Sequence, residues 1–443
     1  MNTPIYDFLL KYAESNMLRC HMPGHKGNPP ENELGFMFDL DITEISGADS
    51  LFEAEGIIAE SEHNMTKLYG SSATVYSAGG STLCIQTMLA LMKQEKRKIF
   101  AVRNVHRSFL NASALLDLDV DWIFPHYFGG ILSGKVVLEE IERKLAECRE
   151  PCCVYITSPD YTGRIADIKG ISEICHRHKA KLLVDNAHGA HLAFFKNSCH
   201  PISLGADLCC DSAHKMLPAL TGAAMLHTVS DQYAERIKQT MSLFASTSPS
   251  YLIMASLDLC CKYIFENIRS DIESGTVFIM QLKNKFSGKL LFADGEPFHI
   301  TVKASASGYN GLEFAEKLRE FGAECEYADR DIVICLMSPV NCRKDYQKLS
   351  EALEYAAESS EKHELTVEDD IVFPQPEKVM SIRDAVFSEQ EEISVENSLG
   401  RICAAVRVPC PPAVPIAVSG EKITCEHINI FKRYGISTVN VVK

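Results

Sequence analysis

The sequence predicts an α/β protein, with a mainly parallel sheet in a large domain and a smaller α+β domain after it. From about residue 56 onward, short apolar runs of strand length alternate with helical stretches. This alternation is typical of a parallel sheet covered by helices on both faces. A long helical stretch at 249–286 ends the pattern. The chain has 443 residues, more than one small core usually contains, so we expect more than one domain.

Residues 1–55 are irregular and rich in Pro, Gly and Asn apart from a short opening helix, and we interpret them as an arm. The large domain is expected at 56–288. It starts with a helix near Ile57–Leu68, a strand at Ala73–Tyr76 and a helix that follows a glycine turn and runs to Met92. Further helices are expected at Leu138–Cys148 and Ile168–His178. The remaining expected strands are Lys98–Val102, Val120–Phe124, Cys153–Thr157, Lys181–Val184 and Asp207–Cys210.

The last domain is expected at 289–443. Its strands are predicted at Phe298–Lys303, Ala323–Tyr327 and Ile332–Leu336, and its helices at Gly311–Phe321 and Arg343–Ser359. A polar linker at 360–370 then leads to a final segment that contains a turn-rich run at 409–415.

Composition excludes several classes of protein. The formal charge is 44 minus 59, or -15, which argues against non-specific nucleic-acid binding. No apolar run reaches the roughly 18 residues that a membrane span needs, and the N-terminus lacks the shape of a signal peptide. The 17 cysteines include no C-x-x-C pair and several lie in apolar runs, so we expect a reducing, cytoplasmic location.

Polar clusters follow several of the predicted strands, and ligands of open α/β sheets bind beyond the carboxyl ends of strands. Gly79-Gly80-Ser81-Thr82 comes after the strand at 73–76 and opens a helix. Glycines allow close approach, hydroxyls donate, and a helix N-terminus attracts anions, so this turn can hold a phosphate. An ordinary glycine turn with a Ser or Thr cap is the alternative. The turn matches neither nucleotide-binding glycine motif, which makes ATP and NAD poor candidates.

Two further clusters contain the residues with the clearest chemistry. Asp185 ends a strand and begins Asp185-Asn186-Ala187-His188-Gly189-Ala190-His191, where its carboxylate can pair with a pyridinium nitrogen or a metal. The H-x-x-H spacing invites a zinc interpretation, but a third ligand is not evident, so we expect no metal. Lys215 follows the strand at 207–210 within Asp211-Ser212-Ala213-His214-Lys215. A lysine held among polar groups can act as a nucleophile toward an aldehyde, although most lysines lie on the surface.

An anion cup, an acidic strand end and a lysine at a third strand end together match the needs of pyridoxal 5'-phosphate (PLP). In this interpretation the carboxylate faces the ring nitrogen and the lysine forms the Schiff base. A fourth cluster at 104–108 contains His106, whose imidazole can lie over the ring. A hydrogen-bonded loop histidine is the alternative for His106.

The chain resembles the Orn/Lys/Arg decarboxylases, PLP enzymes of fold type I with the aspartate-aminotransferase-like fold. The motifs that carry the resemblance occur in order along nearly the whole chain. They are His21-Met22-Pro23-Gly24-His25-Lys26-Gly27, Asp41-Ile42-Thr43-Glu44, Asp49-Ser50-Leu51, Ser158-Pro159-Asp160-Tyr161-Thr162-Gly163, Asp185-x-Ala187-His188-Gly189-x-His191, Ser212-x-His214-Lys215, Thr247-Ser248-Pro249-Ser250-Tyr251, Arg383-Asp384-Ala385, Pro411-Pro412-x-x-Pro415 and Gly420-Glu421. The arm opens the chain directly, so it resembles the short form of the family, without an N-terminal wing domain.

The resemblance implies a seven-stranded, mainly parallel sheet, and it implies roles by position. Lys215 forms the Schiff base, Asp185 keeps the pyridine nitrogen protonated, His106 stacks on the ring, and His188 lies near the cofactor. Residues around the cofactor phosphate and ring would be Gly80, Ser81, Thr82, Ala187, Ser212 and His214. The resemblance also implies a homodimer, or a higher assembly of dimers, in which Thr247 and Ser248 reach the partner's site.

The implied function is α-decarboxylation of a basic amino acid, either arginine, lysine or ornithine. Candidates for contacting the distal cation of that substrate are Glu44, Asp49 and Glu421, each of which can equally be a helix cap or a surface acid. Some motifs depart from the family. Asn186 stands where Glu is common, and Ala78-Gly79-Gly80-Ser81-Thr82 stands where the family usually has Asn-Gly-Thr followed by Ser or Thr. Cys410 and Ala413-Val414 replace Tyr and Gly-Ile. Transamination, β-elimination or a catalytically silent PLP-binding protein with a regulatory role are the alternatives.

Overall fold

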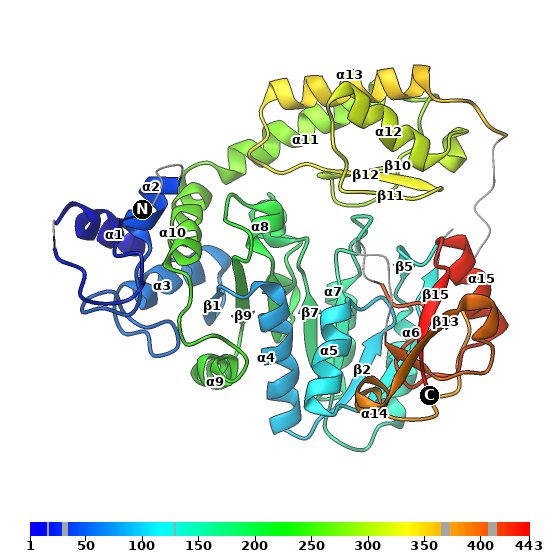
Figure 1. Ribbon diagram of the computed structural model, residues 1–443, viewed down its shortest axis with the longest axis horizontal. Coiled ribbons are helices and arrows are strands. Elements are labelled where there is room, and N and C mark those ends of the chain that lie inside the picture. The colour runs from blue at the N-terminus through cyan, green and yellow to red at the C-terminus, as the bar shows by residue number, and fades with distance from the viewer. Residues whose placement is uncertain (16, 29–33, 128–129, 365–372, 406–413) are drawn as a thin grey trace. The chain divides into compact units, whose positions relative to one another are not determined.

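The computed structural model describes residues 1–443 except 16, 29–33, 128–129, 365–372 and 406–413 (Figure 1). The predicted turn-rich run therefore lies largely outside the described residues. The chain divides into two compact units. The first consists of Met1–Glu95 and Leu182–Ile272, and the second of Lys96–Lys181 and Glu273–Lys443. Domain boundaries at residues 55 and 288 stay a prediction.

The first unit contains four strands that pair in the order β1-β9-β8-β7. β7 and β8 are parallel, while β9 is antiparallel to both of its neighbours. These strands are β1 (Ala73–Ser77), β7 (Lys181–Asp185), β8 (Leu208–Asp211) and β9 (Ala224–Thr228). The helices of this unit are α1 (Pro4–Glu14), α2 (Gly35–Leu40), α3 (Ile57–Tyr69), α4 (Gly80–Gln94), α8 (Ala213–Met216), α9 (Asp231–Ser242) and α10 (Tyr251–Glu266).

The interior strands of this unit are short and apolar because both of their faces are covered. All four residues of β8 are buried, as are the last four of β7. Parallel neighbours place their carboxyl ends at the same edge of the sheet. The residues that follow β7 and β8 therefore meet at that edge, which is where the predicted site lies.

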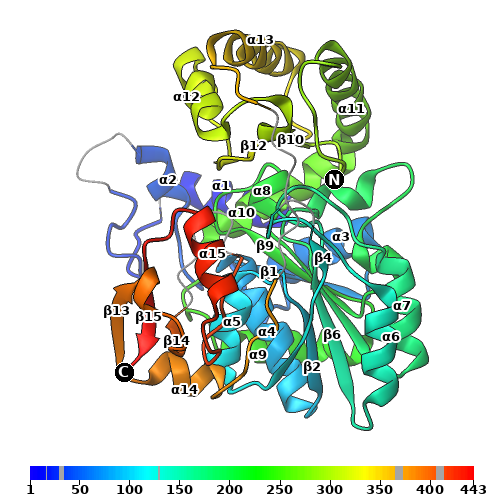
Figure 2. The ribbon, with the colours of Figure 1, turned by 90° about the vertical axis from the view of Figure 1, so that its right-hand side faces the viewer.

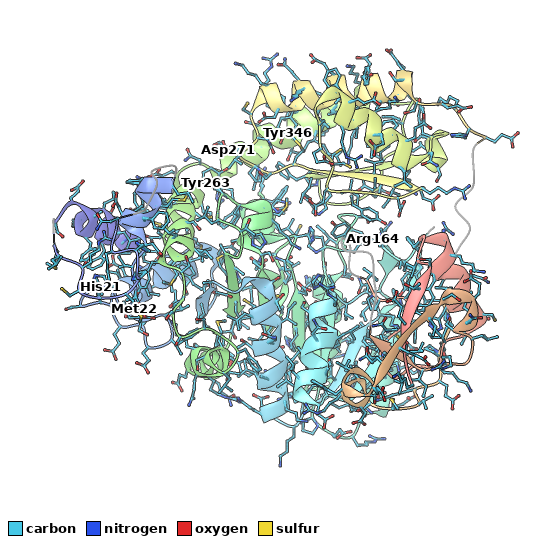
Figure 3. The ribbon with its side chains drawn as sticks, viewed as in Figure 1. His21, Met22, Arg164, Tyr263, Asp271 and Tyr346 are labelled. Atoms are coloured by element: carbon cyan, nitrogen blue, oxygen red, sulfur yellow. The ribbon has the colours of Figure 1, made fainter. Side chains whose placement is uncertain are left out.

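The long predicted helical stretch is two helices rather than one. α10 ends at Glu266, and α11 (Ile268–Lys285) begins after Asn267. The hydroxyl of Tyr263 donates to the Asp271 carboxylate across this junction at 2.8 Å (Figure 3). The break contains neither Pro nor Gly, so composition did not indicate it.

The second unit begins with three parallel strands that pair in the order β6-β2-β3. They are β2 (Lys98–Val102), β3 (Val120–Ile123) and β6 (Cys152–Thr157), and a two-stranded ribbon of β4 (His126–Tyr127) and β5 (Gly134–Lys135) accompanies them. The helices in this portion are α5 (Arg107–Leu116), α6 (Leu138–Glu147) and α7 (Ile168–Arg177). As in the first unit, the predicted strands and helices are confirmed to within one or two residues at most ends.

Two small antiparallel sheets complete the second unit. β10 (His299–Lys303), β12 (Ile332–Leu336) and β11 (Tyr327–Ala328) form one of them, with α12 (Gly311–Phe321) and α13 (Arg343–Ser359) together on one face (Figures 1 and 2). The predicted strand at 323–327 is wrong in its bounds, because pairing with β12 begins only at Glu326, whose N–H donates to the Ile334 carbonyl.

The other small sheet orders β13 (Gln390–Ser394), β15 (Thr438–Val442) and β14 (Cys403–Ala405) beside α14 (Ile382–Phe387) and α15 (Cys425–Arg433) (Figure 2). The large sheet has seven strands in the order β1-β9-β8-β7-β6-β2-β3. The predicted fold class, a mainly parallel α/β domain with a smaller α+β part, is confirmed. Across the described ranges, no helix is long and apolar enough to cross a membrane.

Candidate active site

The centre of the candidate site is a contact between Lys215 and His188. β8 ends at Asp211, Ser212 adopts an extended backbone, and the short helix α8 then carries Lys215 in a half-buried position. His188 lies in the turn after β7 and is buried. Its Nε2 is 3.0 Å from the Lys215 Nζ. The two parallel strands thus bring an amine and an imidazole within proton-transfer distance.

Asp185, the last residue of β7, is 1% exposed. Its Oδ1 accepts hydrogen bonds from the Ala187 N–H at 3.2 Å and from the Cys210 thiol at 3.6 Å. Burial, followed by the nearby Asp185 charge, raises the pKa of Cys210 well above its ordinary value, so Cys210 stays a thiol that can donate. The carboxylate is held at a strand end, in the position that the sequence predicts for a partner of a ring nitrogen.

The predicted anion cup lies at the N-terminus of the 15-residue helix α4. Gly80 has φ +69°, a conformation that favours glycine, and its N–H donates to the Gly222 carbonyl at 2.8 Å. The Ser212 hydroxyl donates to the Ser81 hydroxyl at 2.8 Å, which joins the cup to the lysine motif. Within the described residues no side chain caps this helix, so its first-turn N–H groups remain suited to an anion. Thr82 is exposed on the same turn.

His214 flanks the cup. Its Nδ1–H donates to the Ala223 carbonyl at 2.9 Å, which fixes the ring. Burial lowers the pKa of His214, the Ala223 carbonyl opposes this, and the neighbouring Lys215 charge lowers it further. An anion at the cup would favour the imidazolium form, in which Nε2–H can donate to it.

Other predicted residues occupy different places. His106 belongs to the second unit and caps α5, because its Nδ1 accepts from the Ser108 N–H at 3.2 Å. Thr247 and Ser248 are exposed on the loop between α9 and α10. The stacking role of His106 and the roles of this loop stay predictions.

The three carboxylates proposed for substrate contact also differ in their surroundings. Asp49 caps α3, since backbone N–H groups of Ser50, Glu55, Gly56 and Ile58 donate to it within 3.0 Å. Burial acts to raise the pKa of Asp49, but the backbone donors hold this pKa below its ordinary value. Glu44 is exposed. These contacts fit the cap and surface-acid alternatives, and no contact of either residue tests a substrate role.

Glu421 is 4% exposed and lies in the second unit. Its Oε2 accepts from the Arg103 Nη2 and from the Val418 N–H, each at 2.7 Å. Burial raises the pKa of Glu421, and the Arg103 guanidinium opposes that rise. Arg103 itself is fully buried and lies over the Trp122 ring at 4.8 Å. Sequence reasoning missed Arg103, although it stands three residues before His106.

Sequence reasoning also missed a buried group beneath the loop after β7. It consists of Asn186, His200, Asp211 and His227, all at most 1% exposed. The side chain of Asn186 donates to the Asp211 carboxylate at 2.7 Å. The signal in the sequence was the asparagine itself, at a position where the resembled family commonly has Glu.

Comparison with known proteins identifies the family. The chain matches the major domain of the Orn/Lys/Arg decarboxylases over residues 3–315 and their C-terminal domain over residues 367–434. The chain belongs to the Orn/Lys/Arg decarboxylase family. It is therefore a PLP-dependent amino-acid decarboxylase.

Relatives of this decarboxylase carry related names. An arginine decarboxylase of Bacillus subtilis is 29% identical over 456 residues, which cover 97% of this chain and 93% of the relative. A lysine decarboxylase of Pseudomonas aeruginosa is 22% identical, over 58% of this chain and 39% of its own length. Among solved structures, the Francisella novicida lysine decarboxylase LdcF has a TM-score of 0.82 at 16% identity, covering 100% of this chain and 81% of that one. That structure supports the fold.

The donor set at the end of β7 and β8 fits PLP. The cofactor has an aldehyde, a basic ring nitrogen and a phosphate. Lys215 offers an amine, Asp185 a buried carboxylate, and α4 an N-terminus that no described side chain caps. Ser81 and Ser212, already hydrogen-bonded to each other, offer hydroxyls to the phosphate.

Proposed function

We propose that this decarboxylase removes the α-carboxylate of a basic amino acid, either arginine, lysine or ornithine, to give agmatine, cadaverine or putrescine and CO2. The observation that carries the proposal is the 3.0 Å contact between the Lys215 Nζ and the His188 Nε2. This contact lies at the edge of the sheet where Asp185 ends β7. Relatives that align with nearly the whole chain are named arginine decarboxylase, which supports arginine as the first substrate to test.

When bound, PLP supplies an aldehyde that bonds to amines and a ring that withdraws electrons from the α-carbon of the substrate. Lys215 would hold the cofactor covalently and give way to the substrate amine. Asp185 would keep a proton on the ring nitrogen by its buried negative charge. The imidazole of His188 can accept a proton from the Lys215 amine and return it, so this pair can supply the proton that replaces CO2. Ser81, Ser212 and the N-terminus of α4 would hold the phosphate.

Measured products distinguish this function from its alternatives. Protein loaded with PLP is given arginine, lysine or ornithine, together with citrulline and norleucine, the neutral isosteres of arginine and lysine. The proposal predicts CO2 release from a basic substrate and release at least about tenfold slower from its neutral isostere, since a hydrogen bond to a charged group contributes about 1.5–3 kcal/mol. Keto-acid formation would indicate transamination. Bound cofactor without any turnover would indicate a catalytically silent protein. Lys215→Ala is the control for each substrate.

We also propose that the enzyme works as a homodimer or as an assembly of dimers with shared sites. Several large apolar side chains of the arm are exposed in the single chain, among them Leu18 at 84% and Phe36 at 60%. Exposed apolar clusters of this kind are commonly buried in interfaces. The exposed Thr247 and Ser248 would then reach the cofactor of the partner. Cytoplasmic location, predicted from the cysteines, belongs to the same proposal, and the described cysteines are all free.

A further inference from the structure

A buried polar network lies directly beneath the loop that follows β7. Its centre is Asp211, the last residue of β8, which is fully buried. The Asp211 carboxylate accepts from the His200 Nε2 at 3.0 Å, from the His227 Nε2 at 3.2 Å and from the Asn186 Nδ2 at 2.7 Å. The Cys209 thiol also donates to this carboxylate at 3.8 Å, so four donors surround it in the interior of the first unit.

The outer contacts of the two imidazoles fix which nitrogen carries the proton. The Ile202 N–H donates to the His200 Nδ1 at 3.3 Å, so His200 carries its proton on Nε2 and donates it to Asp211. The Thr74 hydroxyl lies 2.8 Å from the His227 Nδ1 and can donate to it, which leaves the His227 Nε2–H for the same carboxylate. Burial lowers the pKa of His227, which favours the neutral ring.

The carboxylate at the centre is ionised. Burial by itself would raise the pKa of Asp211, but the neighbouring His200 and His227 side chains, which both donate to the carboxylate, bring the pKa well below its ordinary value. A buried carboxylate that accepts from several donors remains charged because each donor stabilises the charged form. Asp211 is thus a fixed negative charge beneath the cofactor loop.

A metal ion is the competing explanation for this cluster. Ligand atoms of His200, Cys209 and Asp211 lie within 4.8 Å of one another. However, a histidine that binds a metal through Nε2 normally donates its Nδ1–H to an acceptor. The His200 Nδ1 instead faces the Ile202 N–H, so Nε2 carries the proton and lacks the lone pair that a metal needs. Burial also raises the pKa of Cys209 well above its ordinary value.

Asn186 links the Asp211 carboxylate to the loop that follows β7. The main-chain carbonyl of Asn186 accepts from the Gly189 N–H at 2.7 Å, which closes a tight turn. A Cβ at position 189 would lie 2.0 Å from the Asn186 Oδ1, so glycine is required there for Asn186 to reach Asp211. At the far end of the loop, the Tyr69 hydroxyl donates to the Ala190 carbonyl at 2.9 Å.

We infer that Asp211 is a positioning residue for the cofactor, acting through Asn186. Asp211 holds the Asn186 side chain and thereby fixes the positions of Asp185, which precedes Asn186, and of His188, which follows it. This inference rests on the proposed function. A glutamate at 186, common in the resembled family, would place a second negative charge against Asp211, so the asparagine and Asp211 require each other.

The test compares three variants with a matched control. Asp211→Asn removes the charge, Asn186→Ala removes the link, and Asn186→Asp with Asp211→Asn reverses the pair while keeping one hydrogen bond. Ser61→Ala is the control, because Ser61 is equally buried in the same unit and donates to Asp258 at 2.6 Å, away from the loop. For each protein we measure the melting temperature without cofactor, the Kd for PLP, and the pH titration of the visible band of the bound cofactor.

We expect Asp211→Asn and Asn186→Ala to raise the Kd for PLP by about tenfold or more, the scale for groups that orient a directly bound residue, and to shift the pH titration of the band. We expect the double variant, Asn186→Asp with Asp211→Asn, to regain part of the affinity for PLP. Ser61→Ala lowers the melting temperature and leaves the Kd and the titration unchanged.

Wild-type Kd and titration in both single variants, with a lower melting temperature, would give Asp211 a purely structural role and overturn the inference. Metal bound in a 1:1 ratio to the purified wild-type protein would overturn it in favour of a metal site. Before these comparisons, borohydride reduction of the wild-type protein is mapped. Absence of a pyridoxyl group on Lys215 would remove the proposed function and this inference together, whereas its presence with unaffected variants removes the inference alone.

Discussion

Substitution of Glu421 separates a structural role from contact with the substrate. The Arg103 Nη2 lies 2.7 Å from the Glu421 Oε2, and their side chains are 0% and 5% exposed. Glu421→Gln keeps the size of the side chain but leaves the buried guanidinium without its counter-charge. Removing one partner of a buried pair costs about 3–5 kcal/mol. With a slope of ~3 kcal/mol/M in urea, the midpoint of unfolding should fall by about 1 M or more.

The chain contains a built-in reporter for this measurement. Trp122 is its single tryptophan, and the Arg103 guanidinium lies over the ring at 4.8 Å. Urea unfolding followed by tryptophan fluorescence therefore reports on this part of the second unit. Glu396→Gln is the control, since Glu396 is 63% exposed in its pair with Lys432 and its substitution should leave the midpoint of unfolding nearly unchanged.

An effect on substrate affinity without an effect on stability would give Glu421 the other role. If Glu421→Gln leaves the fluorescence transition unchanged and instead raises the KM for the basic amino acid about tenfold, a difference of 1.4 kcal/mol in binding, then Glu421 meets the substrate cation. That outcome would support the substrate role predicted from the sequence.

Three further predictions concern turnover, pH and assembly. Asp185→Asn should still bind PLP but lose at least about a hundredfold in turnover, because an amide cannot stabilise a protonated ring nitrogen; near-normal turnover would give Asp185 another role. Burial raises the pKa of Asp258 to about 6, above its ordinary 3.8, so its contribution to stability is lost as the pH rises from about 4 through 6. Melting curves should show that Asp258→Asn flattens this loss, and an unaltered pH profile would contradict the assignment. Hybrids of a Lys215→Ala chain with a Thr247→Ala/Ser248→Ala chain should regain activity in one of two sites; confirmed hybrids without recovery would exclude shared sites.

The parts of the fold with strong local patterns could be predicted from the sequence. Short apolar strands such as β7 and β8 carry their own signal, since both of their faces are buried. β9 was missed because only the first three of its residues, Ala224–Thr228, are apolar, and so short a run is equally compatible with a helix segment. β13 was missed for the opposite reason. Its residues Gln390–Ser394 are partly exposed and mostly polar, and only pairing with β15 makes them a strand.

The residues of the site also fall into those that local motifs predict and those that they do not. Lys215, Asp185 and His188 lie in compact motifs at the ends of neighbouring strands, so their approach follows from the topology. The pair of Arg103 and Glu421 joins residues 318 positions apart, and no local pattern links them. The network around Asp211 also draws on distant residues. In both cases burial selects the partners, because an unpaired charge in the interior is costly.

Peptide mapping after borohydride reduction tests whether Lys215 is the lysine that binds PLP. Purified protein loaded with PLP is reduced, digested and analysed by mass spectrometry. We expect a pyridoxyl group on the peptide that contains Lys215, and its loss in Lys215→Ala. A pyridoxyl group on a different lysine, or on none, would contradict it.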